Sequence, residues 1–218
     1  MGLNQSKGNM YDFISHTWNT IKGECPHGCT YCYMHRWGKL NKARFDKKEL
    51  KTDLGSGNFI FVGSSCDMFA KGIPREWVIE TLDHCKKFPG NKYLFQTKNP
   101  SAINDNYLPA NSVVCTTIET NRHYEDIMKD SPPPFIRGCG MLCIDVPKYV
   151  TIEPVMDFDF DLMLELIIST NAVQVNIGAD SGGNNLPEPS KEKLLNFIMV
   201  LKEYTTVVEK KNLKRLLK

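Results

Sequence analysis

The strongest constraint on the fold is a regular alternation of two apolar patterns along the chain. Short runs of strand composition are each followed by a run with apolar residues at helical spacing. Alternation of this kind predicts a parallel sheet whose strands are joined by right-handed helical crossovers. The expected strands are residues 16–23, 58–63, 92–98, 112–119, 148–155 and 172–180.

The expected helices follow these strands one by one. Residues 74–88 have proline in the first turn and apolar side chains at helical spacing, and residues 121–130 have Asn121 as a candidate N-cap. Six strand–helix units rather than eight predict an α/β fold of the partial (β/α)6 TIM-like barrel type. The other expected helices are residues 34–50, a short helix near Pro100, residues 158–170 and a last helix from Pro189 or Ser190.

The length of 218 residues fits one domain. We expect residues 1–218 to form a single partial-barrel domain, with an N-terminal extension (1–15) and a basic C-terminal tail or helix (204–218). The end of this tail, EKKNLKRLLK, carries five basic residues and one acidic residue, whereas the whole chain has a formal charge of only +2. Such a tail is either a solvated amphipathic helix or a contact for nucleic-acid phosphates.

Cysteine content and hydropathy bear on the compartment. The chain has eight cysteines, no continuous apolar segment typical of a secretory signal, and no run of about 18 apolar residues. Clustered thiols in a reducing compartment bind metal more often than they form disulfides. We therefore expect a cytoplasmic protein that does not span a membrane.

Three of the cysteines, Cys25, Cys29 and Cys32, lie together in CPHGCTYCY. Three thiols cannot close a four-ligand site by themselves, so the identity of the fourth ligand decides the chemistry. His27 and His35 are close enough in sequence to complete a closed zinc site. The crowding of all three thiols into one loop after the first strand favours an iron–sulfur cluster with one iron left open.

Polar side chains gather where the expected strands end. In parallel α/β folds the carboxyl ends of the strands form the mouth at which ligands bind, although such residues also serve as helix N-caps. The set predicts a site for a polar ligand. Its members are Gly63, Ser64, Ser65, Cys66, Asp67, Gln96, Thr97, Lys98, Thr116, Thr117, Glu119, Thr151, Glu153, Asn176, Gly178, Asp180 and Ser181.

Together these motifs resemble the radical S-adenosylmethionine (SAM) superfamily. The cysteine loop, with aromatic Tyr31 before its last cysteine, is similar to the cluster loop of those enzymes. Further blocks are similar to a phage- and prophage-associated branch, itself distantly similar to spore photoproduct lyase, which repairs thymine dimers. These blocks are WN (18–19), FVGSSCDMF (61–69), FQTKNP (95–100), TIE (117–119), TIEPV (151–155) and IGADSGG (177–183).

The resemblance implies specific roles. Cys25, Cys29 and Cys32 would hold a four-iron four-sulfur (4Fe-4S) cluster, whose open iron takes the amino and carboxylate groups of SAM. The usual Gly-Gly-Glu motif after the second strand is Gly-Ser-Ser here, so hydroxyls, carbonyls or Asp67 would receive the SAM amino group. Lys98 suits the SAM carboxylate and Glu119 the ribose hydroxyls. The implied cofactor-binding residues are Tyr31, Gly63, Ser64, Ser65, Asp67, Lys98, Thr117, Glu119, Glu153, Gly178 and Asp180.

The remaining cysteines have separate interpretations. Cys66 is either a thiol hydrogen-atom donor, as in spore photoproduct lyases, or a small buried hydrophobe. Cys139 and Cys143 form another CxxxC in a glycine-rich segment, which we interpret as packing residues or partial ligands. Cys85 and Cys115 lie on apolar faces and are expected in the core. The same holds for the aromatic residues Trp77, Phe158 and Phe160.

The expected function is a radical SAM enzyme that reductively cleaves SAM to a 5′-deoxyadenosyl radical for hydrogen abstraction. A nucleic acid or nucleotide is the substrate that the family association and the basic tail favour. A low-potential electron donor, flavodoxin-like or ferredoxin-like, would be a partner, and a phage-encoded chain would act in the host cytoplasm. The alternatives are a radical SAM enzyme for a peptide or small metabolite, and a non-catalytic zinc or iron–sulfur module that binds nucleic acid.

Overall fold

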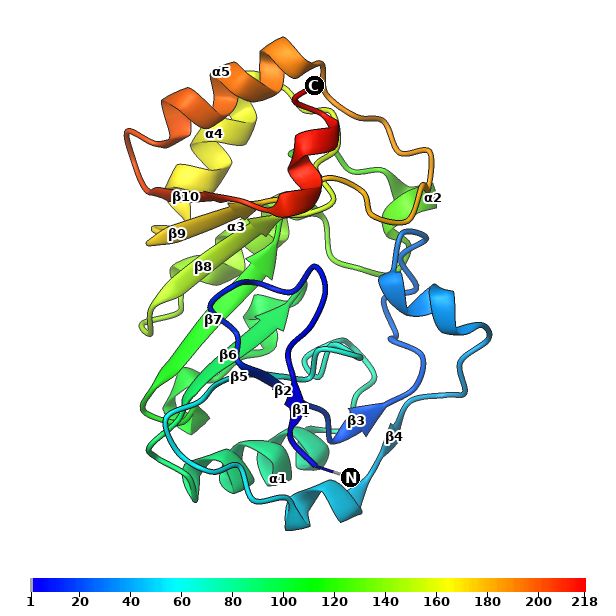
Figure 1. Cartoon of the computed structure of the whole chain (residues 1–218), viewed down its shortest axis with the longest axis vertical. Coiled ribbons are helices and arrows are strands. Elements are labelled where there is room, and N and C mark those ends of the chain that lie inside the picture. Colours follow the sequence, from blue (N-terminus) through cyan, green and yellow to red (C-terminus); the bar gives the residue numbers. More distant parts are fainter. Residues whose placement is uncertain (1) are drawn as a thin grey trace.

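A computed structural model describes residues 2–218, and its centre is one eight-stranded sheet (Figure 1). The strand order is β1-β2-β5-β6-β7-β8-β9-β10, and only β1 runs antiparallel to its neighbour. The strands of this sheet are β1 Asn4–Gln5, β2 His16–Trp18, β5 Phe59–Val62, β6 Lys92–Thr97, β7 Ser112–Thr117, β8 Lys148–Ile152, β9 Gln174–Ile177 and β10 Thr206–Glu209. A separate antiparallel pair, β3 Ile21–Lys22 and β4 Arg44–Phe45, flanks the cysteine loop.

The helices connect the parallel strands. The α-helices are α1 Arg75–Lys86, α2 Glu125–Met128, α3 Pro134–Leu142, α4 Phe160–Ser169 and α5 Lys191–Leu201. Ser190 caps α5, since its hydroxyl accepts a hydrogen bond from the Lys193 amide. The 3-10 helices are η1 Tyr33–Trp37, η2 Lys47–Lys51, η3 Pro100–Ala102, η4 Asp105–Tyr107 and η5 Lys211–Arg215.

The predicted alternation is confirmed: each of the six expected strands contains a strand of the sheet. The helices at 74–88 and 158–170 and the one beginning at Ser190 are also confirmed, as α1, α4 and α5. These strands and helices confirm the predicted α/β class with a mostly parallel sheet. The sheet has two edge strands, β1 and β10, and we find no pairing between them among residues 2–218, so closure toward a barrel stays a prediction.

Two expected helices are wrong. Residues 34–50 instead form η1, β4 and η2, because Gly38 ends η1 at a φ of 79° and the segment has no apolar stripe to bury. Over 121–130 only the short α2 is helical. The Asn121 side chain caps no helix there: its Oδ1 accepts a hydrogen bond from the Asp159 amide.

The glycine-rich segment after the three prolines is a helix that the sequence analysis did not expect. Pro134 occupies the first helical position of α3, where a missing N–H costs nothing. Gly138 and Gly140 lie at close helix contacts, since a Cβ on Gly140 would lie 2.6 Å from Ser101 Oγ. These glycines therefore serve tight packing rather than a flexible loop.

Both chain ends contribute strands to the sheet. The C-terminal tail contains the parallel strand β10, because the β-branched residues of TTVVE favour an extended strand beside β9, and η5 follows it. Within the expected N-terminal extension, residues 2–15 lie against the sheet. Tyr11 and Ile14 pack on the sheet face formed by Phe61, Leu94 and Val113, and Figure 1 shows this segment (dark blue) crossing in front of the sheet.

The opposite face of the same strands packs against α1. Alternate residues such as Ile60, Val62 and Phe95 join Leu82 and Cys85 in the main hydrophobic cluster. A second cluster places Phe158 between α4, α5 and the strands β8 and β9. Cys85, Cys115 and Phe158 are thus fully buried, while Trp77 and Phe160 are partly buried against these cores, as expected.

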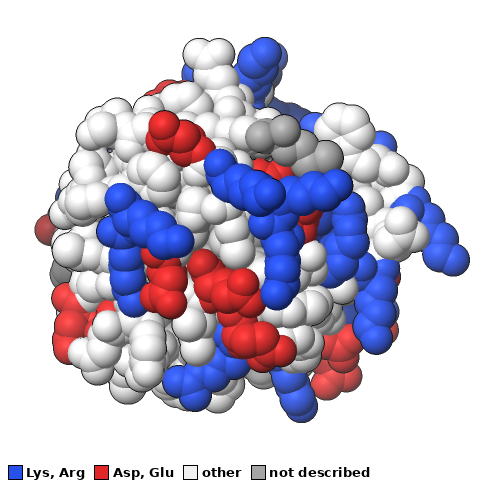
Figure 2. Space-filling view, turned by 90° about the horizontal axis from the view of Figure 1, so that it is seen from below, with Lys and Arg blue, Asp and Glu red and all other residues white. Residues whose placement is uncertain are grey.

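Surface charges of both signs are interspersed on the face seen from below (Figure 2). At this end of the molecule Lys86 Nζ lies 3.1 Å from Asp83 Oδ1, and Lys47 Nζ lies 3.8 Å from Glu80 Oε1. None of the helices formed by residues 2–218 has the length and apolarity needed to cross a lipid bilayer.

Candidate functional site

The cysteine loop lies beside the C-terminal end of α2. The Thr30 amide donates to the Ile127 carbonyl (3.0 Å), and the Cys29 thiol donates to the Met128 carbonyl (3.6 Å). Gly28 allows the turn between the first two cysteines at a φ of +62°. Cys29 is buried, Cys25 and Cys32 are half-buried, and all three thiols are free.

Both histidines near this loop have partners of their own. The buried His27 shares a 2.8 Å hydrogen bond through Nε2 with Asp67 Oδ2, and His35 Nδ1 lies 3.2 Å from the Thr30 carbonyl. Among residues 2–218, no three His, Cys, Asp or Glu side chains are grouped to bind a single metal ion. The closed zinc site needs such a group, whereas the thiolates of an iron–sulfur cluster bind separate irons and need not meet at one point.

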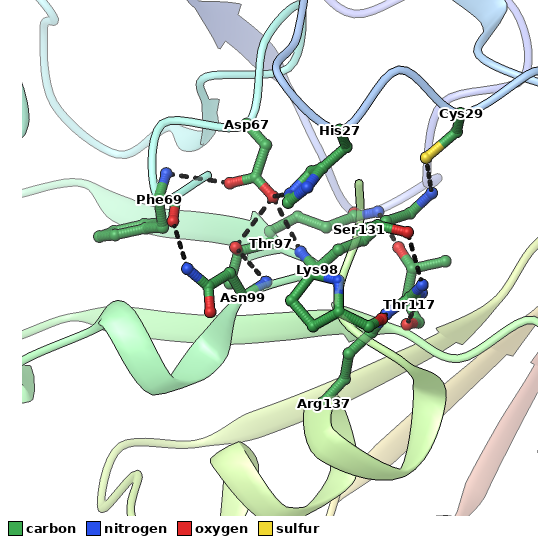
Figure 3. Close-up of polar contacts among 12 residues, drawn as sticks. His27, Cys29, Asp67, Phe69, Thr97, Lys98, Asn99, Thr117, Ser131 and Arg137 are labelled. Carbon is green, nitrogen blue, oxygen red and sulfur yellow. Dashed lines mark hydrogen bonds and ion pairs between the residues drawn. The ribbon is translucent and has the colours of Figure 1, made fainter. Parts of the chain in front are cut away.

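Asp67 joins the cysteine loop to the ends of two strands (Figure 3). Its Oδ2 accepts hydrogen bonds from Thr97 Oγ1 (2.9 Å) and the Lys98 amide (2.8 Å) besides contacting His27, and Oδ1 accepts from the Phe69 amide. Burial opposes ionisation, but His27 and these donors outweigh it and lower the pKa of Asp67. The carboxylate is therefore occupied by protein donors, which makes it a positioning residue rather than a free ligand for a SAM amino group.

Lys98, at the end of β6, extends its ammonium group to the cysteine loop. Nζ lies 3.1 Å from Cys29 Sγ, 2.6 Å from the Tyr31 hydroxyl and 3.0 Å from Glu119 Oε1. It also lies 4.3 Å from the centre of the Tyr31 ring. Desolvation opposes this charge, but Tyr31 and Glu119 raise the pKa of Lys98 well above its ordinary value. A fixed positive charge thus stands beside a predicted cluster ligand.

Glu119 is completely buried between two cations. Its Oε2 lies 2.7 Å from Arg137 Nη1, its Oε1 faces Lys98, and the Tyr31 hydroxyl donates to Oε1. Burial favours the neutral acid, yet Arg137 and Lys98 outweigh it and lower the pKa of Glu119 to about 2. Both carboxylate oxygens already have protein partners, so ribose hydroxyls would have to share or displace them.

The sequence analysis missed Arg137. Its side chain is fully buried and donates to the Thr117 carbonyl and to Ser131 Oγ (Figure 3). It also donates to the Pro132 carbonyl and to Glu119 Oε2. The signal available in the sequence was a single arginine in the apolar run PFIRGCGML, since a buried arginine needs an acidic partner. Thr117, whose hydroxyl accepts from Gln96 Nε2, lies in the same network.

The loop after β5 also contacts the cysteine loop, since the Tyr33 hydroxyl donates to the Ser64 carbonyl. The Cys66 thiol is a hydrogen-bond partner of Cys25, which lowers the pKa of Cys25 and raises the pKa of Cys66. Asn19 Oδ1 accepts from the Ser64 hydroxyl and the Ser65 amide, while the Ser65 hydroxyl is buried and has no hydrogen-bond partner among residues 2–218. Gly63 provides the turn at a φ of +78°.

Glu153, Gly178 and Asp180 lie at the ends of β8 and β9 and form a separate group. Glu153 accepts hydrogen bonds from Asn9, Lys210 and Asn212, none of which the sequence analysis named. A Cβ on Gly178 would come within 2.7 Å of Glu153 Oε1, so only glycine leaves room for this carboxylate. Asp180 instead accepts from Gly182 and Asn184 in its own loop.

Cys139 and Cys143 are exposed on α3 and at its C-terminal end. Neither belongs to a metal-binding group among the described residues.

Among the comparisons with known proteins, the similarity lies in the fold of solved structures. No protein-family model and no curated protein sequence matches the chain. Several solved structures of spore photoproduct lyase, a radical SAM enzyme, do match in fold. A cysteine-to-alanine mutant has a TM-score of 0.62 at 10% identity, with 94% of this chain and 80% of that chain covered.

Two further structures of that enzyme contain ligands. A double mutant with bound AdoMet and dinucleoside spore photoproduct has a TM-score of 0.58 at 12% identity, covering 94% of this chain and 66% of that chain. A complex with the dinucleoside has a TM-score of 0.58 at 10% identity, covering 78% of this chain and 57% of that chain. The present chain thus spans less than two thirds of the length of these two proteins. At such identities the likeness establishes the fold, and it agrees with the distant similarity inferred from the motifs.

Proposed function

We propose that this protein is a radical SAM enzyme. The observation that carries the proposal is the open cysteine triad at the carboxyl ends of the parallel strands, with Lys98 against Cys29, in the fold of spore photoproduct lyase. Cys25, Cys29 and Cys32 are free thiols that fit three irons of a 4Fe-4S cluster. When bound, the cluster supplies the electron for reductive cleavage of SAM, which in turn supplies the hydrogen-abstracting group.

Different side chains around the cysteine loop would contact different groups of SAM. The Ser65 hydroxyl, which is buried and has no partner within the described part of the chain, would accept from the SAM amino group, and Gly63 and Ser64 shape the turn that presents it. Lys98 would exchange its contact with Cys29 for the SAM carboxylate once the thiolate is bound to iron. Tyr31 and Glu119 lie within the reach of Lys98, so they orient the same ligand.

A nucleic acid or nucleotide remains the proposed substrate class. Its support is the dinucleoside ligand of the structurally similar lyase and the charge of η5, where Lys211, Lys214 and Arg215 cluster. Glu153, Asn9 and Asn212 offer amide and carboxylate groups at the strand ends for polar recognition of that substrate. Cys66 is buried in the hydrophobic cluster against which Cys25 packs, and its role as a hydrogen-atom donor is a further part of this proposal. The phage association and the host cytoplasm are further parts of this proposal.

Anaerobic reconstitution with iron and sulfide tests the proposal. We expect a brown protein with about four irons per chain, which releases methionine and 5′-deoxyadenosine from SAM after reduction by dithionite. The Cys29→Ala variant should lose both the cluster and the cleavage, whereas Cys143→Ala, which changes an exposed cysteine, should retain both. A colourless wild-type protein that binds one zinc ion would refute it.

A further inference from the structure

The exposed side of helix α3 consists of apolar residues and cysteines. These residues follow one another at i, i+1, i+4, i+7 and i+8, so they lie within one arc of the helix and its C-cap. We call this surface the α3 strip, and its members are Phe135, Ile136, Cys139, Leu142 and Cys143. The one charged residue of the helix, Arg137, is buried on the other side and pairs with Glu119.

The other long helices have the usual composition of a surface helix, with charged residues opposite the core. Their exposed charged residues include Arg75 and Glu76 on α1, Asp161 and Glu165 on α4, and Lys191 and Glu192 on α5. A helix that is apolar all round is ordinarily covered on all sides. The composition of α3 therefore indicates that a further surface covers the α3 strip.

The neighbouring helix α4 enlarges this apolar surface. The two helices touch, since a Cβ on Gly138 would lie 2.5 Å from Leu166 Cδ1. Leu162 lies one turn before Leu166, on the side of α4 that faces α3. The exposed fractions are 64% for Phe135, 48% for Ile136, 54% for Leu142 and 58% for Leu162.

The area of this surface is sufficient for a specific contact. An aromatic side chain buries about 150–250 Å² and an aliphatic one somewhat less, so the α3 strip and Leu162 present roughly 500 Å² per chain. Two such surfaces packed together would bury about 1,000 Å², which is the lower limit for a specific interface between proteins.

The order of side chains along the α3 strip suits pairing with a second copy of itself. In an antiparallel pair related by a twofold axis through the centre of the strip, Phe135 lies against Cys143 of the other copy, and Ile136 against Leu142. Each large side chain thus meets one that is smaller or of similar size. Cys139 lies at the centre, where a small side chain lets the two helix axes approach closely.

We propose that the α3 strip is the interface of a homodimer, in which two α3 helices pack antiparallel with Cys139 at the twofold axis. An uncharged strip can face its own copy without bringing like charges together, whereas a charged surface cannot. A second copy also supplies an apolar face of the same length. The dimer does not depend on the proposed radical SAM function. It would, however, fix the helix from which Arg137 reaches Glu119, 2.7 Å away.

Sedimentation velocity of the whole chain tests the dimer over a range of protein concentrations. The interface variant combines Phe135→Glu with Leu142→Glu. The control variant combines Leu195→Glu with Met199→Glu, which changes two exposed apolar residues of α5 and adds the same charge. Far-ultraviolet circular dichroism compares the fold of each variant with that of the wild type.

We expect the wild type and the control variant to be dimers at tens of micromolar. The dimer of the interface variant should be at least about 100-fold weaker, because it would bury four carboxylates without partners. A wild type that is still monomeric at about 200 μM would overturn the proposal and leave the α3 strip to a different partner. Equal dimerisation of the interface variant and the wild type would also overturn it.

Anaerobic oxidation with diamide tests the position of the twofold axis and leaves the apolar side chains of the strip unchanged. Each Cys139 thiol gives up one hydrogen to the N=N bond of diamide, and the two sulfurs form a disulfide between the copies. Two Cys143 residues would lie about 12 Å apart along the helix axis, too far for a disulfide. We expect Cys143→Ser to retain the covalent dimer on a denaturing gel and Cys139→Ser to abolish it. A covalent dimer that persists in Cys139→Ser would overturn the arrangement, even if the interface variant failed to fold.

Discussion

Replacing Arg137 with methionine should destabilise the protein strongly, because it leaves a buried carboxylate without its main partner. The guanidinium is fully buried and lies 2.7 Å from Glu119 Oε2, and it also satisfies Ser131 and two carbonyl groups. Breaking a buried pair by removing one ion costs about 3–5 kcal/mol. The pKa of Glu119, which Arg137 and Lys98 together lower from 4.5 to about 2 against the effect of burial, corresponds to about 3 kcal/mol of net stabilisation of the ionised carboxylate by all its partners.

The sign of the pH dependence follows from the same pKa. Glu119 has a lower pKa when folded than when unfolded, so its contribution is fully present above pH 4.5 and is lost as the pH falls toward 2. The Arg137→Met variant should therefore lose part of this acid sensitivity as well as stability at pH 7. Urea unfolding, followed by far-ultraviolet circular dichroism at several pH values, measures both quantities.

The surface residue Arg122 provides the matched control. It pairs with Asp157 and Asp159 at the surface, where screening leaves such contacts a much smaller effect. Adding Glu119→Leu to Arg137→Met should recover part of the lost stability, because the unpaired charge is removed together with its partner. An Arg137→Met variant no less stable than Arg122→Met would refute the reasoning.

Three further predictions concern other sites. Asp67→Asn should weaken the attachment of the cysteine loop to β6 and lower the iron content after reconstitution, measured against Asp53→Asn, a surface change. Gly178→Ala should destabilise the protein by about 1–3 kcal/mol in urea unfolding, because the new methyl group meets Glu153; an unchanged midpoint would contradict the contact. Burial lowers the pKa of His84, so the unfolded chain takes up the proton first and unfolding should become easier as the pH falls below 6.5; His84→Gln should flatten that dependence in thermal melts between pH 5 and 7.

Much of the fold was predictable because its signals are local. Apolar runs such as 58–63 and 92–98 specify strands through neighbours in sequence, and the amphipathic run 74–88 specifies α1 in the same way. The errors arose where a local cue competed with packing. In the tail, the basic residues favoured a helix in the prediction, although the β-branched residues before them form β10. The glycines of α3 suggested a loop, although they allow close helix contacts.

The sequence by itself determined the parallel α/β class and the three thiols in one loop, since spacing along the chain is enough to define both. Tertiary structure alone decided the environment of those thiols. Asp67 is 40 residues from His27, and Arg137 is 18 residues from Glu119, so no pattern in the chain pairs them. Buried charges need partners at hydrogen-bond distance, and only the packed sheet and helices bring such distant residues that close.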